Sequence, residues 1–222
     1  VALGVAAVLV LLGGSASAGR GTRAVGSECA AMSQSSGYVA DFVTAISAAV
    51  RRVAPEFDLP ERPTDAFVTA HAALSSGWGR STLARDHHNL FGVKAGTSWT
   101  GQTVELTTTD YDDVTGAPTV HVQRWRVYTS YDASIRDHLR LVTGMPRYRA
   151  SAALLKAGDV DYMAQMGRDG WYSVSQVDRT SAEWRSIVRR ILGLQGLPMV
   201  GGGGSGGAVV VGTLLVLWAL LG

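Results

Sequence analysis

The sequence predicts an α+β fold that is mostly α, formed by a single domain of residues 36–195. Apolar residues recur at helical spacing on both sides of a central stretch. That stretch is instead rich in threonine and β-branched residues around a turn signal. With 222 residues, of which 46% are hydrophobic, the chain can bury a sizeable core, which excludes a disordered protein.

The first two helices are expected from their spacing and their end signals. The first begins at Val39 and should end before Pro55, because proline lacks the backbone N–H that a helix needs. The second should open at Pro63, with Thr64 as its N-cap, and stop at Gly77. The apolar positions of the first helix are Val39, Phe42, Val43, Ile46, Ala49, Val50 and Val53.

The central stretch between Thr103 and Tyr128 predicts a small β-hairpin. Threonine-rich and β-branched segments flank residues 112–116, Asp-Asp-Val-Thr-Gly, a composition typical of a turn. Helical spacing then returns twice, which predicts two further helices. The residues with that spacing are Ile135, Leu139 and Val142, and then Trp184, Ile187, Val188, Ile191 and Leu192.

The N-terminal end differs from the middle of the chain because no charged residue precedes Arg20. Residues 1–18 are largely apolar and end in Ala-Ser-Ala, a pattern typical of a secretory signal peptide, with a buried core helix as the alternative. Residues 19–35 are small and polar, which indicates a linker.

The C-terminal end has a glycine-rich linker at residues 196–207 and an apolar, uncharged segment at residues 208–222. That segment is shorter than the roughly 20 residues that cross a bilayer, but the neighbouring glycines extend the span. We expect a membrane anchor, and hence an exported protein held at the cell envelope with its domain on the extracytoplasmic side. Residues 197–201, LPMVG, also resemble a sorting signal, although Val200 replaces its threonine.

Composition argues against several partners. A net charge of +2, from 20 basic and 18 acidic residues, gives no reason to expect nucleic acid. The single Cys29 excludes an intramolecular disulfide and a multi-cysteine metal site. The run Asp86-His87-His88 is weak evidence for a metal, because adjacent histidines point in different directions and no further ligands stand out. We therefore expect neither metal nor cofactor.

The segment from His71 to Ser81, HAALSSGWGRS, resembles the signature AQAALESGWGRS of bacterial glucosaminidase domains. This is glycoside hydrolase family 73, the mannosyl-glycoprotein endo-β-N-acetylglucosaminidase-like family. Residues 170–172, Gly-Trp-Tyr, stand where the family often has a GYATDP-like loop but match it poorly. Other motifs follow in the family's order: NLFGVKA at 89–95, SWTG at 98–101, TTDY at 108–111, RVY at 126–128 with Ser130, and Arg147-Tyr148.

The resemblance implies a lysozyme-like fold with a small β-lobe flanking a glycan groove. It also implies hydrolysis of the β-1,4 bond after N-acetylglucosamine in peptidoglycan. Aromatic rings suit the apolar faces of pyranose sugars, although core packing is the alternative for each of them. The candidate substrate-binding residues are Trp99, Trp125, Tyr128, Tyr148, Trp171 and Tyr172, together with Asn89 and Phe91.

The family's general acid is the glutamate of its LESGWG run, and Ser75 stands at that position. A serine hydroxyl is too weak an acid at neutral pH to protonate the leaving oxygen, and general acid catalysis typically contributes about 10²–10⁴-fold. The second family carboxylate aligns with Asp110, one methylene shorter than the usual glutamate. We therefore expect catalysis to be weak or absent.

His71 is an alternative acid, since it replaces the family's glutamine and lies one helical turn before Ser75. A packed or groove-lining histidine is the simpler interpretation, because no third member of a catalytic triad is evident. Glu105, Asp112 and Asp113 could also substitute, but their pattern indicates solvated charges. Two hypotheses remain. One is a membrane-tethered peptidoglycan N-acetylglucosaminidase with an unconventional acid, and the other is a non-catalytic pseudoenzyme that binds peptidoglycan or acts as an envelope scaffold.

Overall fold

The computed structural model describes the backbone of residues 25–195 and the side chains from residue 37 onward. The expected signal segment (1–18), the glycine-rich linker (196–207) and the apolar anchor (208–222) lie outside the described residues. Within residues 25–195, no helix combines the length and the apolar character that a membrane span requires.

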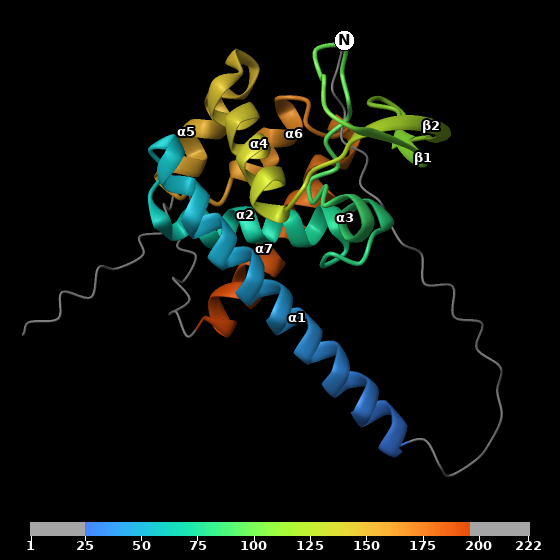
Figure 1. Cartoon of the computed structure of the whole chain (residues 1–222), viewed down its shortest axis with the longest axis vertical. Coiled ribbons are helices and arrows are strands. Elements are labelled where there is room, and N and C mark those ends of the chain that lie inside the picture. The colour runs from blue at the N-terminus through green and yellow to red at the C-terminus, as the bar shows by residue number, and fades with distance from the viewer. Residues whose placement is uncertain (1–24, 196–222) are drawn as a thin grey trace, which may run out of the picture.

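The described part of the chain is mostly helical, with one two-stranded antiparallel sheet, as predicted (Figure 1). The short helices α3, α5 and α6 were not expected from the sequence. The elements in chain order are α1 (Val25–Val53), η1 (Ala54–Phe57), α2 (Glu61–Ser76), α3 (Thr82–His87), β1 (Thr103–Tyr111), β2 (Pro118–Arg126), α4 (Tyr131–Gly144), η2 (Pro146–Tyr148), α5 (Arg149–Ala157), α6 (Tyr162–Arg168), η3 (Val174–Gln176) and α7 (Val177–Leu194).

Two expectations about helix starts need correction. Helix α1 begins at Val25, so the linker expected over residues 19–35 is helical over much of its length, and this part extends away from the other helices (Figure 1). The segment contains alanine, glutamate and methionine but no proline, and such residues extend an existing helix at little cost. Thr64 is not the N-cap of α2. The backbone of Arg62 is extended (φ −120°, ψ 138°), so the regular helix opens at Pro63, as expected, and Thr64 lies within its first turn.

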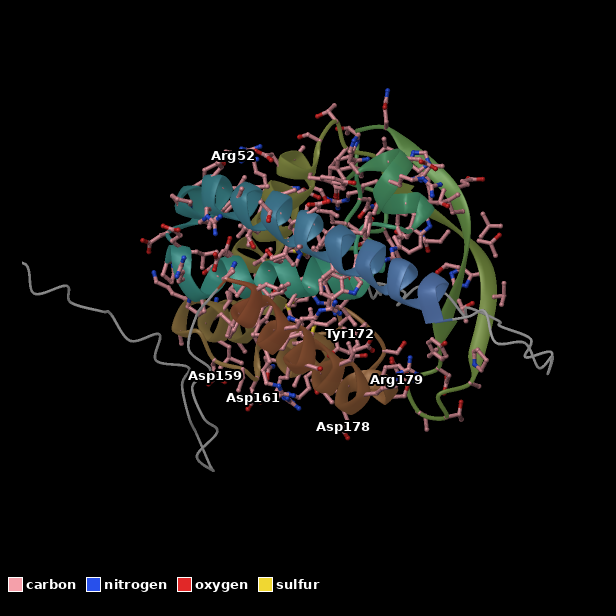
Figure 2. The ribbon with its side chains drawn as sticks, turned by 90° about the horizontal axis from the view of Figure 1, so that it is seen from below. Arg52, Asp159, Asp161, Tyr172, Asp178 and Arg179 are labelled. Carbon is pink, nitrogen blue, oxygen red and sulfur yellow. The ribbon has the colours of Figure 1, made fainter. Side chains whose placement is uncertain are left out.

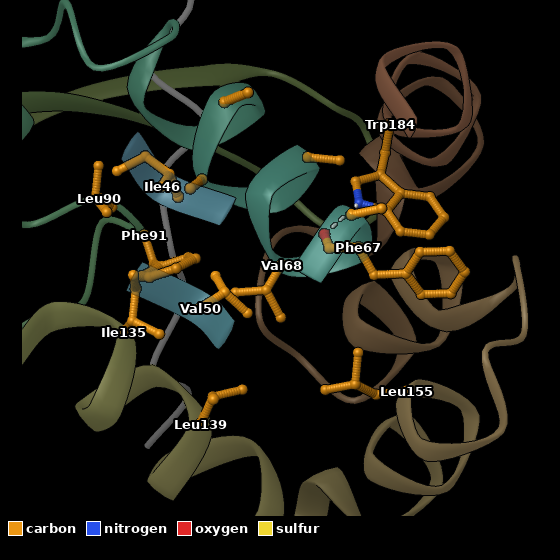
Figure 3. Close-up of a cluster of buried hydrophobic side chains, with 14 of the residues drawn as sticks. Ile46, Val50, Phe67, Val68, Leu90, Phe91, Ile135, Leu139, Leu155 and Trp184 are labelled. Carbon is orange, nitrogen blue, oxygen red and sulfur yellow. Dashed lines mark hydrogen bonds between the residues drawn. The ribbon is translucent and has the colours of Figure 1, made fainter. Parts of the chain in front are cut away.

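Helix α2 occupies the centre of the core. Twelve of its 16 residues are buried, and it packs against both α1 and α7. In Figure 3 the ring of Phe67 lies beside Trp184 of α7, with ring centroids 4.9 Å apart, and Trp184 Nε1 donates to the Phe67 carbonyl at 3.2 Å. The rigid position of α2 therefore fixes its C-terminal end, where Ser75 lies.

The hairpin forms as predicted, with its turn at residues 112–116. The Asp112 carboxylate accepts hydrogen bonds from the N–H groups of Val114 and Thr115, and Gly116 takes the positive φ of 69° that the turn requires. The register pairs Asp110 with Thr119, and alternation along the strands gives the hairpin two distinct faces. The inner face carries Val104, Leu106, Thr108 and Asp110 from β1, and Thr119, His121, Gln123 and Trp125 from β2.

Candidate functional site

Ser75 lies half-buried in the last turn of α2, at a helix end that is tightly constructed. The Ser76 hydroxyl donates to the Ala72 carbonyl and accepts from the Gly79 N–H at 2.7 Å. Gly77 ends the helix in the left-handed region, at φ 60°. These bonds fix the direction in which the Ser75 side chain points.

Ser75 borders a small pocket between the end of α2, helix α6 and the beginning of α7. Its lining is mostly apolar, and none of the described residues that line it is an aspartate or a glutamate. Tyr172, which lines the pocket, lies close to the beginning of α7, whose exposed side carries Asp178 and Arg179 (Figure 2). The lining residues are His71, Leu74, Ser75, Met163, Trp171, Tyr172 and Thr180.

His71 is buried in a cluster of aromatic rings. Its side chain is 1% exposed, and its ring centroid lies 4.8 Å from that of His138, 5.3 Å from Phe91 and 5.6 Å from Trp171. Burial lowers the pKa of His71 to about 3, so the ring is neutral near neutral pH. His71 therefore lacks the proton that a general acid must carry, and the packed, pocket-lining interpretation describes it.

His138 of α4 is a second buried histidine that the sequence analysis did not single out. Its ring stacks on Phe91 with centroids 4.0 Å apart, and its Nε2 lies 3.4 Å from the Tyr162 hydroxyl. Burial, with a smaller effect of His71, holds the pKa of His138 well below its ordinary value. The available signal was its place beside Leu139, on the apolar face of the helix.

Asp110 lies on the inner face of the hairpin in a charged setting. Its Oδ2 accepts a hydrogen bond from Lys94 Nζ at 2.7 Å, and His121 Nε2 lies 3.4 Å from the same oxygen. The Asp110 side chain is 32% exposed, whereas that of Lys94 is only 11% exposed. Neither Lys94 nor His121 was identified from the sequence, because their proximity to Asp110 depends on strand pairing and loop packing.

A buried ion pair joins the base of the hairpin to α4. Arg126 Nη1 donates to Asp137 Oδ2 at 2.6 Å, and the Tyr128 hydroxyl donates to the same oxygen at 2.7 Å. Arg140 pairs with the other oxygen of Asp137. Burial and the Asp137 charge raise the pKa of Tyr128 above its ordinary range. The Tyr128 side chain is only 6% exposed, and its hydroxyl helps to join the hairpin to α4.

Several candidate substrate-binding residues lie in the core. Trp125, Tyr148 and Phe91 are at most 1% exposed, which leaves no ring face for a pyranose, so core packing describes them. Asn89 is also 1% exposed, and its amide binds the backbone of Val93 and the carbonyl of Arg126. The motif NLFGVKA therefore shapes the loop before the hairpin.

The remaining candidates lie at two places. Trp171 and Tyr172 line the pocket beside Ser75 and His71, and the Tyr172 hydroxyl donates to the Met163 carbonyl at 2.7 Å. Trp99 is half-buried on the hairpin side, where the Arg126 guanidinium lies 4.5 Å from its ring centroid. The structure thus groups the α2-end residues together and places Asp110 and Trp99 with the hairpin.

The tip of the hairpin is attached to the loop that follows the pocket residues. The Ser173 hydroxyl donates to the Tyr111 carbonyl at 2.6 Å, and the Val174 N–H donates to Asp113 Oδ1 at 2.9 Å. Figure 2 shows the hairpin curving along one side of the helices toward the beginning of α7. We refer to these two hydrogen bonds as the tip clasp.

Comparison with known proteins gives a consistent result. The glucosaminidase family model, described as mannosyl-glycoprotein endo-beta-N-acetylglucosaminidase, matches residues 61–193. The chain is 36% identical over 131 residues to the peptidoglycan hydrolase FlgJ of Salmonella typhimurium, covering 56% of this chain and 40% of that protein. It is 30% identical over 139 residues to the Pseudomonas aeruginosa FlgJ, covering 61% and 33%. The chain therefore spans less than half the length of these relatives.

Solved structures are similar over most of the domain. A peptidoglycan hydrolase from Sphingomonas sp. A1 has a TM-score of 0.55 at 28% identity, covering 73% of this chain and 98% of that one. The glycoside hydrolase domain of Salmonella typhimurium FlgJ, truncated at its C-terminus, has a TM-score of 0.53 at 28% identity, covering 70% and 98%. The catalytic domain of the Listeria monocytogenes autolysin Auto is similar in fold, at 24% identity and a TM-score of 0.56, covering 71% and 86%. The predicted lysozyme-like fold is confirmed.

Proposed function

The chain belongs to the glucosaminidase family, and we propose that it binds the glycan strands of peptidoglycan while hydrolysing them weakly or not at all. The observation that carries this proposal is the end of α2. Two hydrogen bonds of the Ser76 hydroxyl hold its last turn, and Ser75 lies there beside a pocket that has no carboxylate among its described lining residues. Ser75 as the replacement of the family's acid is part of the proposal.

The chemistry of glycoside hydrolysis explains why this end of α2 matters. Departure of the sugar oxygen needs a proton from a nearby acid, and a serine hydroxyl does not supply one near neutral pH. Neutral His71 does not supply one either, because burial lowers its pKa to about 3. Lys94 donates a hydrogen bond to Asp110 on the hairpin. In the family resemblance Asp110 aligns with the second carboxylate and not with the general acid.

Glycan binding needs no proton donor, whereas hydrolysis does, so a protein can bind glycan without hydrolysing it. Trp171 and Tyr172 line the pocket beside Ser75, but their side chains are only 2% and 7% exposed, so half-buried Trp99 on the hairpin side is the candidate aromatic with the most open ring face for a sugar. The printed names of the FlgJ relatives, peptidoglycan hydrolases, support peptidoglycan as the ligand. An active N-acetylglucosaminidase with an unconventional acid is the competing function, and it rests on the family relationship alone.

We further propose that the protein is exported and held at the cell envelope. The apolar segments 1–18 and 208–222 support this proposal from the sequence alone. Carbonate extraction of membranes should leave the full chain in the pellet, and deletion of residues 201–222 should release it. Recovery of the full chain entirely in the soluble fraction would overturn the anchor.

The experiment that tests the function measures binding and turnover in the same samples. The full chain is incubated with purified peptidoglycan sacculi, bound protein is measured by co-sedimentation, and released reducing ends are counted. We expect protein in the pellet and reducing ends near the level of a no-enzyme control, with a muramidase digest showing that the sacculi are cleavable. Rapid release would establish the active enzyme, and absence of both binding and release would remove both functions.

A further inference from the structure

Two arginines and two aromatic rings meet on the surface beside the turn that ends α2. Arg80 lies over the ring of Tyr38, with its Cζ 4.6 Å from the ring centroid, and Arg190 of α7 lies over the ring of Trp78 at 5.2 Å. The Tyr38 hydroxyl donates to the Trp78 carbonyl at 2.7 Å, which joins the two pairs. We refer to Tyr38, Trp78, Arg80 and Arg190 as the arginine–aromatic row.

Both guanidinium groups of the row are accessible to a ligand. Arg80, Arg190 and Tyr38 are exposed, and Trp78 is half-buried. Among the side chains that the structure describes, neither arginine forms an ion pair with a carboxylate. Stacking on a ring holds one face of a guanidinium and leaves the N–H groups at its edge able to donate. The row therefore presents two positioned sets of positively charged donors.

Trp78 has a strained backbone that its neighbours hold in place. Its φ of 61° lies in the left-handed region, which is rare for a bulky side chain. Its N–H donates to the Ala73 carbonyl at 2.8 Å, and Phe42 packs edge-on against its ring with centroids 5.9 Å apart. Strain of this kind concentrates at functional positions. A strained tryptophan that keeps part of its ring at the surface indicates that this surface binds a partner.

The charge of the row restricts the chemistry of that partner. A planar guanidinium matches a carboxylate through two parallel hydrogen bonds. Asp41 is exposed on the next turn of α1 after Tyr38, so one negative charge borders the row and the two arginines leave it net positive. The two cations lie on different rings, which suits an extended ligand with more than one carboxylate.

The row also lies close to Ser75 along the chain. Trp78 follows Ser75 by three residues, so their Cα atoms are at most about 11 Å apart. The glycan strands of peptidoglycan carry short peptide stems with free carboxylates, and a stem of about four residues extends to roughly 14 Å. A stem on a glycan bound beside Ser75 can therefore reach the row.

We propose that the arginine–aromatic row binds the carboxylates of a peptidoglycan peptide stem, with Arg80 and Arg190 as donors. The rings of Tyr38 and Trp78 hold the guanidinium groups and contact the apolar parts of the stem. None of the four residues lines the pocket beside Ser75, so the row is a separate site. This inference rests on the proposed function, since it adds the peptide part of the same polymer to glycan binding.

A matched pair of sacculi tests the row. Treatment with a carbodiimide and ammonium chloride converts the stem carboxylates to neutral amides and leaves the glycan strands and the peptide backbone in place. The full chain is titrated with native and with amidated sacculi at low salt, and bound protein is measured by co-sedimentation. We expect native sacculi to bind at least about fivefold more tightly, the effect of two exposed ion pairs. Equal affinities would overturn the inference.

Two charge-matched variants assign the preference to the row. Arg80→Gln combined with Arg190→Gln removes both donors from exposed positions, so the fold should persist and the preference for native sacculi should disappear. Arg124→Gln combined with Arg149→Gln removes the same charge from exposed positions on β2 and α5 and should keep the preference. Equal losses in the two double variants would show that net charge alone causes the preference, which would overturn the inference.

Asp41→Asn is a variant with the opposite expected sign. It removes the negative charge that borders the row without touching either donor, so affinity for native sacculi should rise by about twofold. Affinity for amidated sacculi should stay the same. A fall in affinity for native sacculi would contradict the binding of an anionic ligand at the row.

A chitooligosaccharide separates this inference from the proposed function, because it has no peptide and no carboxylate. Its binding should be the same in the native chain and in the Arg80→Gln, Arg190→Gln variant. Failure of the native chain to bind either the chitooligosaccharide or sacculi would overturn the proposed function itself. Phosphatidylglycerol vesicles provide the last comparison. Loss of vesicle binding in the same variant, with unchanged binding to sacculi, would assign the row to lipid headgroups and overturn the peptide stem as its partner.

Discussion

The two halves of the site, the end of α2 and the inner face of the hairpin, differ sharply in their electrostatic character. Around Ser75 the lining is apolar and aromatic, and its buried histidine is neutral. Around Asp110 a lysine and a second histidine lie within hydrogen-bonding or ion-pairing distance of a single carboxylate. The end of α2, which was expected to supply the proton, is therefore suited to neutral groups. The inner face of the hairpin depends instead on charged side chains.

Restoring an acid at the end of α2 should have the largest effect. Ser75→Glu places a carboxyl group beside an apolar pocket, which raises its pKa and keeps it protonated as an acid must be. We expect the release of reducing ends from peptidoglycan to rise by about 10²–10⁴-fold. Adding Asp110→Glu, which reaches one methylene further, should raise it again.

Ser75→Gln is the matched control for this experiment, because it has the size of glutamate without the proton. Equal activity of the Glu and Gln variants would show that the acid lies elsewhere. Robust hydrolysis by the native chain that survives Ser75→Ala but disappears in His71→Ala would assign the acid to the histidine.

Removing the charge of Asp137 in α4, which pairs with Arg126 at the base of the hairpin, should destabilise the fold strongly. Asp137→Asn leaves the Arg126 guanidinium, whose side chain is 5% exposed, without its counter-ion. Loss of one partner of a buried pair costs about 3–5 kcal/mol of unfolding free energy, measurable by urea denaturation. Asp132→Asn is the control, because its partner Arg52 is 59% exposed (Figure 2), and such a pair is worth less than about 1 kcal/mol. Equal losses of unfolding free energy in Asp137→Asn and Asp132→Asn would contradict the expected difference between a buried and an exposed ion pair.

The stability of the fold should depend on pH because His71, at the end of α2, is buried in its neutral form. The folded-state pKa of His71 is about 3, against an ordinary value of 6.5, so the unfolded chain binds more protons between these values. Stability must therefore fall as pH drops below about 6.5, by up to roughly 1.4 kcal/mol per pH unit for this group. His138 adds a loss in the same direction, because its pKa is also lowered.

Urea denaturation at pH 7, 6 and 5 measures this dependence. His71→Gln removes the titrating group, so its stability should depend less steeply on pH than that of the native chain. His87→Gln, outside the ring cluster, reports the effect of losing a histidine elsewhere. If His71→Gln and the native chain show parallel pH dependence, the imidazole is not held neutral by the fold.

Local patterns in the sequence were enough to predict the longer elements. Helices α4 and α7 and the turn at residues 112–116 follow from apolar spacing and turn residues, which act over short distances. The helices α3, α5 and α6 are too short to show a clear period, so their formation depends on tertiary packing.

The site was predictable where it is contiguous in sequence. Ser75 and His71 lie on one helix, one turn apart, and their proximity follows from helix geometry. The contacts of Asp110 with Lys94 and of Arg126 with Asp137 join segments 16 and 11 residues apart, and only the folded structure brings them together. Aromatic residue type alone likewise does not separate a buried ring from one that faces a groove.

The tip clasp divides the molecules into those with an attached hairpin tip and those with a released one, and a ligand that needs the released tip binds only the second group. Two neutral or singly charged hydrogen bonds contribute roughly 2 kcal/mol in total, so the released tip would be present in about one molecule in thirty at 25 °C. A ligand that requires the released tip binds about thirtyfold more weakly than its own contacts allow, since only that fraction is competent. A ligand that binds alongside the attached tip has no such loss.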